Sequence, residues 1–197
     1  MAESREPALR LFVACPLPAA ALEALAAAQR QLQQAGAPPL RWVRPQGIHL
    51  TLKFLGDVSQ ERTTAVADAL AQAVVGLPPF TLALAGLGTF GDRRGPRVVW
   101  IDVAGEVERL AEAQRRVETA MATLGFPSEG RPFSPHLTLA RVPEGLPPPQ
   151  RHLLAQLVRQ VEPPAAAAAI SRVCLIRSIL ERGGAIYQEL ATFSLSH

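Results

Sequence analysis

The sequence predicts an α+β fold made of two pseudo-symmetric lobes, each with its own mostly antiparallel sheet. Strand-like and helix-like patterns alternate along the chain, and a strand followed by a helix and a strand pair occurs twice. Both of these units open on the segment His-Leu-Thr-Leu, at 49–52 and 136–139, and an arginine (Arg44 or Arg131) stands five residues before each histidine. A tight polar turn within each strand pair favours antiparallel pairing. We interpret the repeat as an internal duplication.

Each element in the first part of the chain has its own signal. Residues 8–17 are an apolar, β-favouring run that a proline closes, and residues 18–36 contain strong helix formers and end at a glycine. Residues 48–56 alternate in polarity and end at a turn glycine, which is typical of a strand. Residues 59–76 are expected to form a helix, with Ser59 as a possible cap.

The second part of the chain repeats this order. Residues 80–90 and 97–103 are two strands around a polar turn, and residues 106–125 form an amphipathic helix that ends at a glycine. The remaining elements are a strand over 135–142, a helix over 150–161, and two strands over 169–180 and 185–195.

Bulk properties limit the class of protein. A chain of 197 residues with 48% apolar residues can bury a core without disulfides or metal. The net charge of +3 permits an anionic ligand without requiring one. No segment resembles a secretory signal or a membrane span, so we expect a cytoplasmic protein with no membrane partner. Cys15 and Cys174 lie in apolar runs and are expected to be buried, free thiols.

The repeated tetrapeptide can present an imidazole and a hydroxyl on one face of a strand. Residues i and i+2 share a face, so His49 and Thr51 point one way, as do His136 and Thr138, while leucines point into a core. If a pseudo-twofold axis relates the lobes, both pairs meet in one central cleft. Phosphoester chemistry suits this arrangement, because in-line displacement needs a base on one side of phosphorus and an acid on the other. Threonine hydroxyls can donate to the non-bridging oxygens.

The two motifs and their surroundings resemble the two-histidine phosphoesterases. The sequence is most similar to the bacterial and archaeal RNA 2′,3′-cyclic phosphodiesterases, also called 2′-5′ RNA ligases. The resemblance covers nearly the whole chain, and it includes the segments LRLFVACPLP, HLTLKFLG, TFGDRRGPRVVWIDV, GRPFSPHLTLAR and the closing pattern Y-x-E-L-x-x-F-x-L.

The resemblance implies a single domain over 1–197, made of two interleaved lobes whose antiparallel sheets face a central cleft, with helices outside. It makes His49 the general acid and His136 the general base in opening a 2′,3′-cyclic phosphate, and it makes Thr51 and Thr138 ligands of the non-bridging oxygens. The implied partner is RNA with a 2′,3′-cyclic phosphate end, such as a tRNA fragment. The resemblance also implies 2′-5′ ligation, in which a 5′-hydroxyl replaces water as the nucleophile. The residues alone do not say which histidine is acid and which is base.

Further side chains near the motifs are candidates for substrate binding. Arg141 occupies the position in the second motif that Phe54 occupies in the first. Arg141 is expected either to bind phosphate or to face solvent. Phe54 is expected either to stack on a base or to pack in the core. By strand alternation Lys53 lies on the face of His49 and Thr51, where it could bind phosphate.

Other polar or aromatic side chains have two open interpretations each. Arg44, Arg131 and the basic turn that contains Arg93, Arg94 and Arg97 either contact RNA or face solvent. Tyr187 either stacks on a base or packs internally. His152 and His197 have no partner motif, and no role is assigned to them.

The sequence has no carboxylate–histidine cluster with metal-ligand spacing, so we expect neither a metal nor a cofactor. We also expect a monomer, since the duplication already supplies both halves of the site. The sequence leaves two alternatives open. One is a non-catalytic RNA-end binding protein. The other is an enzyme that acts on another substrate, either another cyclic phosphate such as that of ADP-ribose or an RNA 3′ end that it trims.

Overall fold

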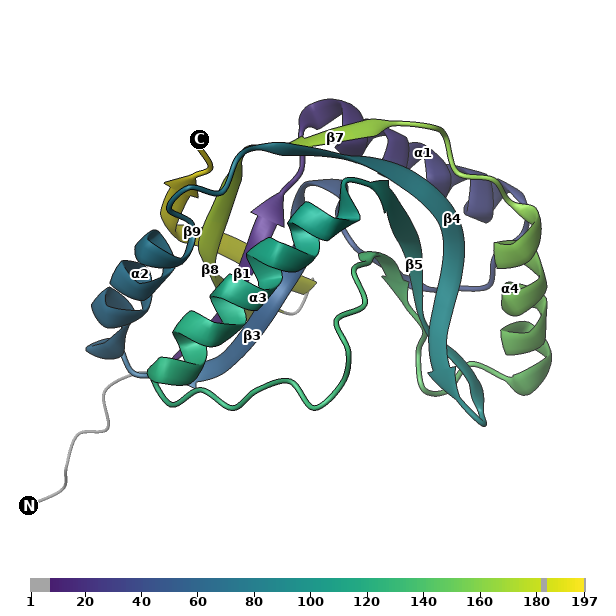
Figure 1. The fold of residues 1–197 in the computed structure, drawn as a ribbon. Coiled ribbons are helices and arrows are strands. Elements are labelled where there is room, and N and C mark those ends of the chain that lie inside the picture. The colour runs from purple at the N-terminus through teal and green to yellow at the C-terminus, as the bar shows by residue number, and fades with distance from the viewer. Residues whose placement is uncertain (1–7, 182–183, 197) are drawn as a thin grey trace, which may run out of the picture.

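The computed structural model describes residues 8–181 and 184–196 (Figure 1). The first seven residues, the centre of the turn at 181–184, and His197 lie outside the described residues. The strands are β1 (Leu9–Pro16), β2 (Arg41–Trp42), β3 (His49–Val58), β4 (Phe80–Asp92), β5 (Gly95–Gly105), β6 (Leu137–Arg141), β7 (Ala167–Ile170), β8 (Arg172–Glu181) and β9 (Gly184–Ser194). The helices are α1 (Ala19–Gln34), α2 (Arg62–Ala73), α3 (Val107–Thr123) and α4 (Pro148–Gln160), with a 3₁₀ turn, η1, at Pro45–Gly47.

The strands form two antiparallel sheets, which confirms the predicted α+β class. One sheet has the order β3-β1-β8-β9 and the other has the order β2-β6-β5-β4-β7. Helix α3 packs on β3 and on α2 beside the first sheet, whereas α4 packs on β4 and β5 and α1 contacts β7 beside the second (Figure 1). Each sheet thus contains one of the two motif strands, β3 and β6.

The hairpin that follows each motif strand joins the opposite sheet. After β3 and α2, the chain forms β4 and β5, which lie beside β6; after β6 and α4, it forms β8 and β9, which lie beside β1. In the sequence repeat, the motif strand and the following hairpin belong to one unit. In the structure, they belong to different sheets. The two sheets are therefore linked by several chain crossings.

The structure departs from the predicted elements in three places. The predicted strand over 169–180 is broken at Ser171, because β7 pairs with β4 in one sheet and β8 pairs with β1 in the other. The prediction that Ser59 caps the second helix is wrong, since α2 begins at Arg62 without a side-chain cap. The short strand β2 and η1 were not predicted, and their two and three residues are too few to show a period.

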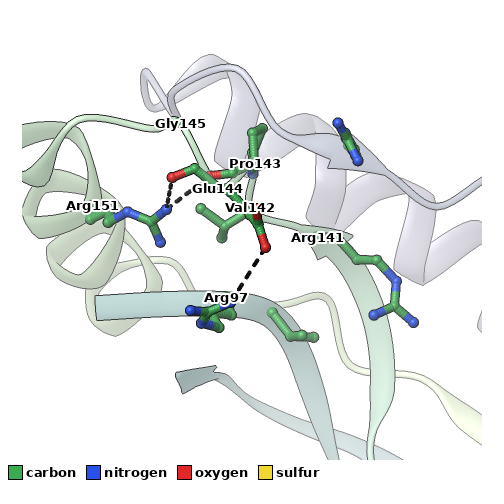
Figure 2. Close-up of a pocket in the computed structure, with 9 residues that line it drawn as sticks. Arg97, Arg141, Val142, Pro143, Glu144, Gly145 and Arg151 are labelled. Atoms are coloured by element: carbon green, nitrogen blue, oxygen red, sulfur yellow. Dashed lines mark hydrogen bonds and ion pairs between the residues drawn. The ribbon is translucent and has the colours of Figure 1, made fainter. Parts of the chain in front are cut away.

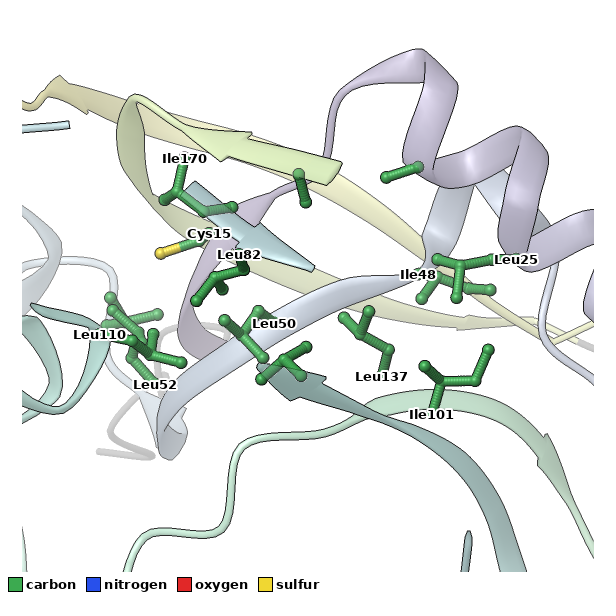
Figure 3. Close-up of a cluster of buried hydrophobic side chains, with 14 of the residues drawn as sticks. Cys15, Leu25, Ile48, Leu50, Leu52, Leu82, Ile101, Leu110, Leu137 and Ile170 are labelled. Carbon is green, nitrogen blue, oxygen red and sulfur yellow. The ribbon is translucent and has the colours of Figure 1, made fainter. Parts of the chain in front are cut away.

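The leucines of both motifs are buried in one hydrophobic cluster, as predicted. Leu50, Leu52, Leu137 and Leu139 all belong to it, and Figure 3 shows Leu50 and Leu137 in the same cluster. Both cysteines are buried and free, which confirms that prediction as well. Within the described residues, no helix is long and apolar enough to cross a membrane.

Candidate active site

The two motif histidines have the same local geometry. The Nδ1 atom of His49 lies 2.8 Å from the carbonyl oxygen of Gly47, and the Nδ1 atom of His136 lies 2.8 Å from the carbonyl oxygen of Ser134. Since a carbonyl oxygen only accepts hydrogen bonds, Nδ1 carries the hydrogen in both rings. The Nε2 atom of each neutral imidazole is then left as the proton acceptor. The two copies of the motif therefore share the histidine and also its tautomer.

Two aromatic rings surround His49. Phe12 of β1 stacks on the imidazole with ring centroids 4.6 Å apart, and Tyr187 of β9 meets it edge-on at 4.9 Å. Tyr187 also packs over Gly47, where a Cβ would lie only 3.3 Å from its ring. The ring of Tyr187 thus helps to hold the imidazole and the carbonyl that orients it.

Burial lowers the pKa of His49 from its ordinary value of 6.5 to about 4, although the bond to the Gly47 carbonyl opposes this shift. In the absence of a nearby negative charge, this imidazole is therefore neutral at pH 7. An acid role would require bound substrate to raise this pKa, because a nearby negative charge favours the protonated form.

The lowered pKa of His49 makes folding stability dependent on pH. Between about pH 6.5 and pH 4 the unfolded chain binds a proton that the folded chain excludes, so stability is lost as the pH falls through this window. We expect the midpoint of thermal unfolding to fall less in His49→Gln than in the wild type between pH 7.5 and about pH 4.5. His152→Gln, on the exposed side of α4, is the matched control. An equal fall in wild type and His49→Gln would contradict the lowered pKa.

His136 is also flanked by aromatic rings. Phe90 of β4 meets it edge-on at 4.8 Å, and Trp100 of β5 lies 6.4 Å away. Trp100 pairs across strands with Gly88, where a Cβ would overlap the indole ring. Gly88 therefore allows the indole to lie against β4. The sequence does not indicate that Phe12, Phe90 and Trp100 neighbour the histidines, because only the pairing of distant strands brings them there.

The threonine hydroxyls lie on the same strand faces as the histidines. Thr51 pairs with Ala14 and Thr138 pairs with Trp100, and both threonines are half-buried. No hydrogen-bond partner for either hydroxyl is found within 8–181 and 184–196. Both hydroxyls are thus available to a ligand.

The prediction that Lys53 lies on the face of His49 and Thr51 is wrong. A β-bulge at Leu52 leaves that residue unpaired between the Thr51–Ala14 and Lys53–Val13 pairs, and the alternation of β3 shifts by one residue. Lys53 is consequently only 2% exposed. Its Nζ donates to Glu118 of α3 at 2.8 Å and to the carbonyl of Pro127 at 2.9 Å. Lys53 therefore has a structural role rather than a role in substrate binding.

The same shift brings Phe54 to the open face of the sheet. Its side chain is 63% exposed, and its ring lies 6.1 Å from that of Phe12, which stacks on His49. The expectation that Phe54 packs in the core is thus wrong. Its exposed ring is available to a planar ligand.

The second motif has the equivalent bulge at Leu139, between the pairs Thr138–Trp100 and Ala140–Val99. Ala140 is buried, as Lys53 is, and Arg141 is exposed, as Phe54 is. Arg141 therefore lies on the face of His136 and Thr138, at the end of β6. Arg141 and Phe54 thus occupy equivalent positions, as the sequence predicts, and each follows an equivalent β-bulge.

The other candidate residues are exposed or have protein partners. Arg44, Arg131, Arg93 and Arg94 are exposed. Arg97 pairs with Asp92 at 2.8 Å, and His152 contacts Gln156 on the exposed face of α4.

Hydrogen bonds join the segment before the first motif to the second motif strand. The amide of Val43 donates to the carbonyl of Leu139 at 2.9 Å, and the side chain of Gln29 donates to the carbonyls of both residues at 2.7 and 3.0 Å. Strands β3 and β6 also contact each other. Because their leucines share one core, the histidines of both strands point away from that core.

Metal ligands do not gather at this site: within the described residues, no group of three or more histidine, cysteine, aspartate or glutamate side chains could hold a metal ion.

The two antiparallel sheets and the duplicated His-x-Thr strands together define the class of protein, a two-histidine phosphoesterase. A model of the LigT-like phosphoesterase family matches residues 16–100 and again residues 101–187, so that each match contains one motif. The chain therefore belongs to the LigT-like phosphoesterase family.

Individual relatives agree with the family. The RNA 2′,3′-cyclic phosphodiesterase of Methanothermobacter thermautotrophicus is 32% identical over 188 residues, which cover 95% of this chain and 99% of the relative. The protein of that name from Geobacillus stearothermophilus is 37% identical over 186 residues, which cover 93% of this chain; the chain spans only 56% of that relative's length.

Solved structures of E. coli LigT resemble the whole chain. The apo form superposes with a TM-score of 0.76 at 28% identity and covers 98% of this chain and 100% of LigT. The complex of LigT with 3′-AMP superposes with a TM-score of 0.74 at 28% identity and covers 96% of this chain and 99% of LigT.

Proposed function

We propose that this protein hydrolyses RNA ends that carry a 2′,3′-cyclic phosphate and leaves a 2′-phosphate, without a metal ion. The observation that carries the proposal is the duplicated hydrogen bond from Nδ1 of His49 and His136 to a backbone carbonyl, which leaves two Nε2 atoms free for proton transfer. The names of the relatives and the complex of LigT with a nucleoside 3′-phosphate support this substrate class.

In the proposed mechanism, the imidazoles of both lobes face one shared groove. Neutral His136 accepts a proton from water, and the water oxygen forms a bond to phosphorus on the side opposite the leaving oxygen. The bond from phosphorus to O3′ breaks, and His49 donates a proton to O3′. The reaction thus adds water across one P–O bond and needs no co-reactant. The assignment of acid and base follows the family resemblance, and the low pKa of His49 means that the phosphate must first raise it.

Substrate binding in the proposal uses both sheets. Thr51 and Thr138 donate to the non-bridging oxygens of the reacting phosphate, Arg141 binds a phosphate of the RNA strand, and Phe54 stacks on the terminal base. A 5′-hydroxyl in place of water would give 2′-5′ ligation, for which tRNA fragments are suitable substrates. We further propose that 1–197 is one domain of two interleaved lobes, and that it acts as a cytoplasmic monomer.

The proposal is tested with an RNA oligonucleotide that ends in a 2′,3′-cyclic phosphate. We expect turnover that EDTA leaves unchanged, and a product whose phosphate is on O2′ when it is mapped by phosphorus NMR. Binding without turnover would identify an RNA-end binding protein instead. Faster turnover of ADP-ribose cyclic phosphate than of the RNA would show that RNA is not the preferred substrate.

The threonines should contribute mainly to the transition state. Thr51→Val and Thr138→Val keep the side-chain shape and remove one donor each, so we expect each to lower kcat by about 10²–10³ with a smaller change in KM. Thr192→Val, on β9, is the control. A change confined to KM would contradict a role in stabilising developing charge.

A further inference from the structure

A cavity of about 530 Å³ lies at the end of the second motif strand, beyond the histidines. It is lined by side chains of β2, β5, β6, the loop after β6, and α4 (Figure 2). The charged residues of its lining are Arg41, Arg97, Arg141, Arg151 and Glu144. Four guanidinium groups against one carboxylate make this cavity strongly basic.

Two of these arginines are direct cross-strand neighbours. Arg41 and Arg141 are directly paired across β2 and β6, so both side chains lie on the same face. Like charges at directly opposite positions destabilise a sheet. Neither arginine forms an ion pair within the part of the chain that the structure describes. An anion between them would relieve this repulsion.

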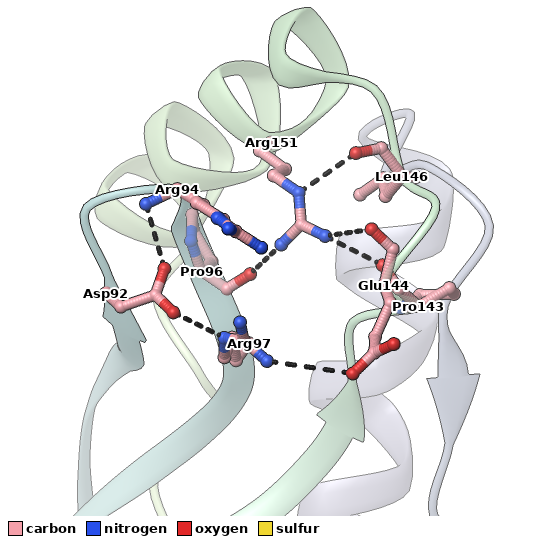
Figure 4. A network of polar contacts seen from close by, with 8 residues as sticks. All are labelled: Asp92, Arg94, Pro96, Arg97, Pro143, Glu144, Leu146 and Arg151. Atoms are coloured by element: carbon pink, nitrogen blue, oxygen red, sulfur yellow. Dashed lines mark hydrogen bonds and ion pairs between the residues drawn. The ribbon is translucent and has the colours of Figure 1, made fainter.

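Arg151 adds a buried positive charge to the wall. It is only 8% exposed, and its guanidinium donates to four backbone carbonyls, those of Pro96, Pro143, Glu144 and Leu146, at 2.7–2.9 Å (Figure 4). A carbonyl satisfies the donors but does not neutralise the charge. Arg151 therefore fixes the loop after β6, and no carboxylate of residues 8–181 or 184–196 forms an ion pair with it.

Among the residues that the structure describes, Arg97 is the one arginine of the cavity with carboxylate partners. It bonds to Asp92 at 2.8 Å and lies 3.9 Å from Glu144, and it remains about half exposed. Figure 4 shows it between these two carboxylates, on the side of the network opposite to Leu146. The cavity as a whole keeps an excess of positive charge, which attracts an anion.

The cavity shares Arg141 with the face of the second motif, but its lining includes none of the motif histidines and threonines. The bulge at Leu139 puts Arg141 on the face of Thr138, and a separation of three residue steps spans roughly 10 Å along a strand. A phosphate held by Arg41 and Arg141 is thus a different phosphate from the one between the histidines.

We propose that this cavity is a second phosphate site, which binds a backbone phosphodiester of the same RNA strand whose end reacts at the histidines. The inference rests on the proposed function and deepens it: the substrate is an oligonucleotide rather than a mononucleotide. The aromatic face of Phe54 and this basic cavity then hold the strand on opposite sides of the reacting phosphate.

The test compares a 2′,3′-cyclic mononucleotide with a dinucleotide that has the same cyclic end and one internal phosphodiester. We expect the wild type to have a kcat/KM about tenfold higher or more for the dinucleotide, and Arg41→Gln to lose most of this preference. The log–log salt dependence should be steeper for the dinucleotide by about 0.7, and Arg41→Gln should remove that difference. Arg159→Gln, an exposed arginine on α4, is the control and should keep the preference.

The outcomes separate this inference from the proposed function. If neither substrate is hydrolysed, the proposed function is wrong. If the wild type hydrolyses both with equal kcat/KM, or if Arg41→Gln keeps the preference and the salt difference, the second phosphate site is wrong and the hydrolytic function stands.

Discussion

Replacing either motif histidine should remove nearly all turnover of an RNA 2′,3′-cyclic phosphate. Each proton transfer in the proposed mechanism contributes on the order of 10²–10⁴ in rate, so we expect His49→Ala and His136→Ala each to lower kcat by about that factor. Because the two groups act on one reaction step, the double variant should be little slower than the worse single variant. Single-turnover assays of the wild type and the three variants measure these effects.

Two controls separate chemistry from folding in this experiment. His49 packs against Phe12 and Tyr187, so His49→Gln keeps most of its volume and should be as inactive as His49→Ala. His152→Ala removes a histidine from the exposed face of α4 and should retain full activity. If either motif variant kept more than about half of the wild-type turnover while folded, the two-histidine mechanism would be wrong.

The single lysine of the chain should be important for stability rather than for catalysis. Lys53→Met leaves the Glu118 carboxylate and the Pro127 carbonyl without their donor, and loss of one partner of a buried pair costs about 3–5 kcal/mol. The Glu118 side chain is 20% exposed, which favours the lower end of this range. For a chain of this size we expect the thermal midpoint to fall by on the order of 10 °C. Calorimetry or circular dichroism would measure it.

The buried pair also connects the two motifs. Glu118 accepts a second hydrogen bond from the backbone of Glu129, so the pair ties β3 and α3 to the segment that leads to His136. Removing both charges in Lys53→Met/Glu118→Leu should restore much of the lost stability, because no unpaired charge remains. Arg172→Met, which breaks a half-exposed contact with Glu189 at 3.6 Å, should change stability by less than about 1 kcal/mol. A Lys53→Met variant as stable as Arg172→Met would refute this interpretation.

The helices and strands were largely predictable because the residues that indicate them lie within or next to each segment. Three helices end close to glycines in the left-handed region, Gly36, Gly76 and Gly125, as the sequence indicates. The pairing partners were not predictable in the same way. Ser171 separates two apolar strands that enter different sheets, and nothing in the apolar run 169–180 distinguishes them.

The sequence by itself determined the repeated His-x-Thr pairs, the leucines behind them and the α+β class, because alternation along a strand fixes which side chains share a face. Only the tertiary structure decided where that alternation is interrupted. The bulges at Leu52 and Leu139 turn Lys53 into the core and bring Phe54 and Arg141 to the face of the histidines. Likewise Arg41, Arg97 and Arg151, far apart in sequence, meet in one cavity because β2, β5 and α4 come together around the end of β6. Bulges and strand neighbours depend on contacts between distant segments, and a one-residue shift in register exchanges the two faces of a strand.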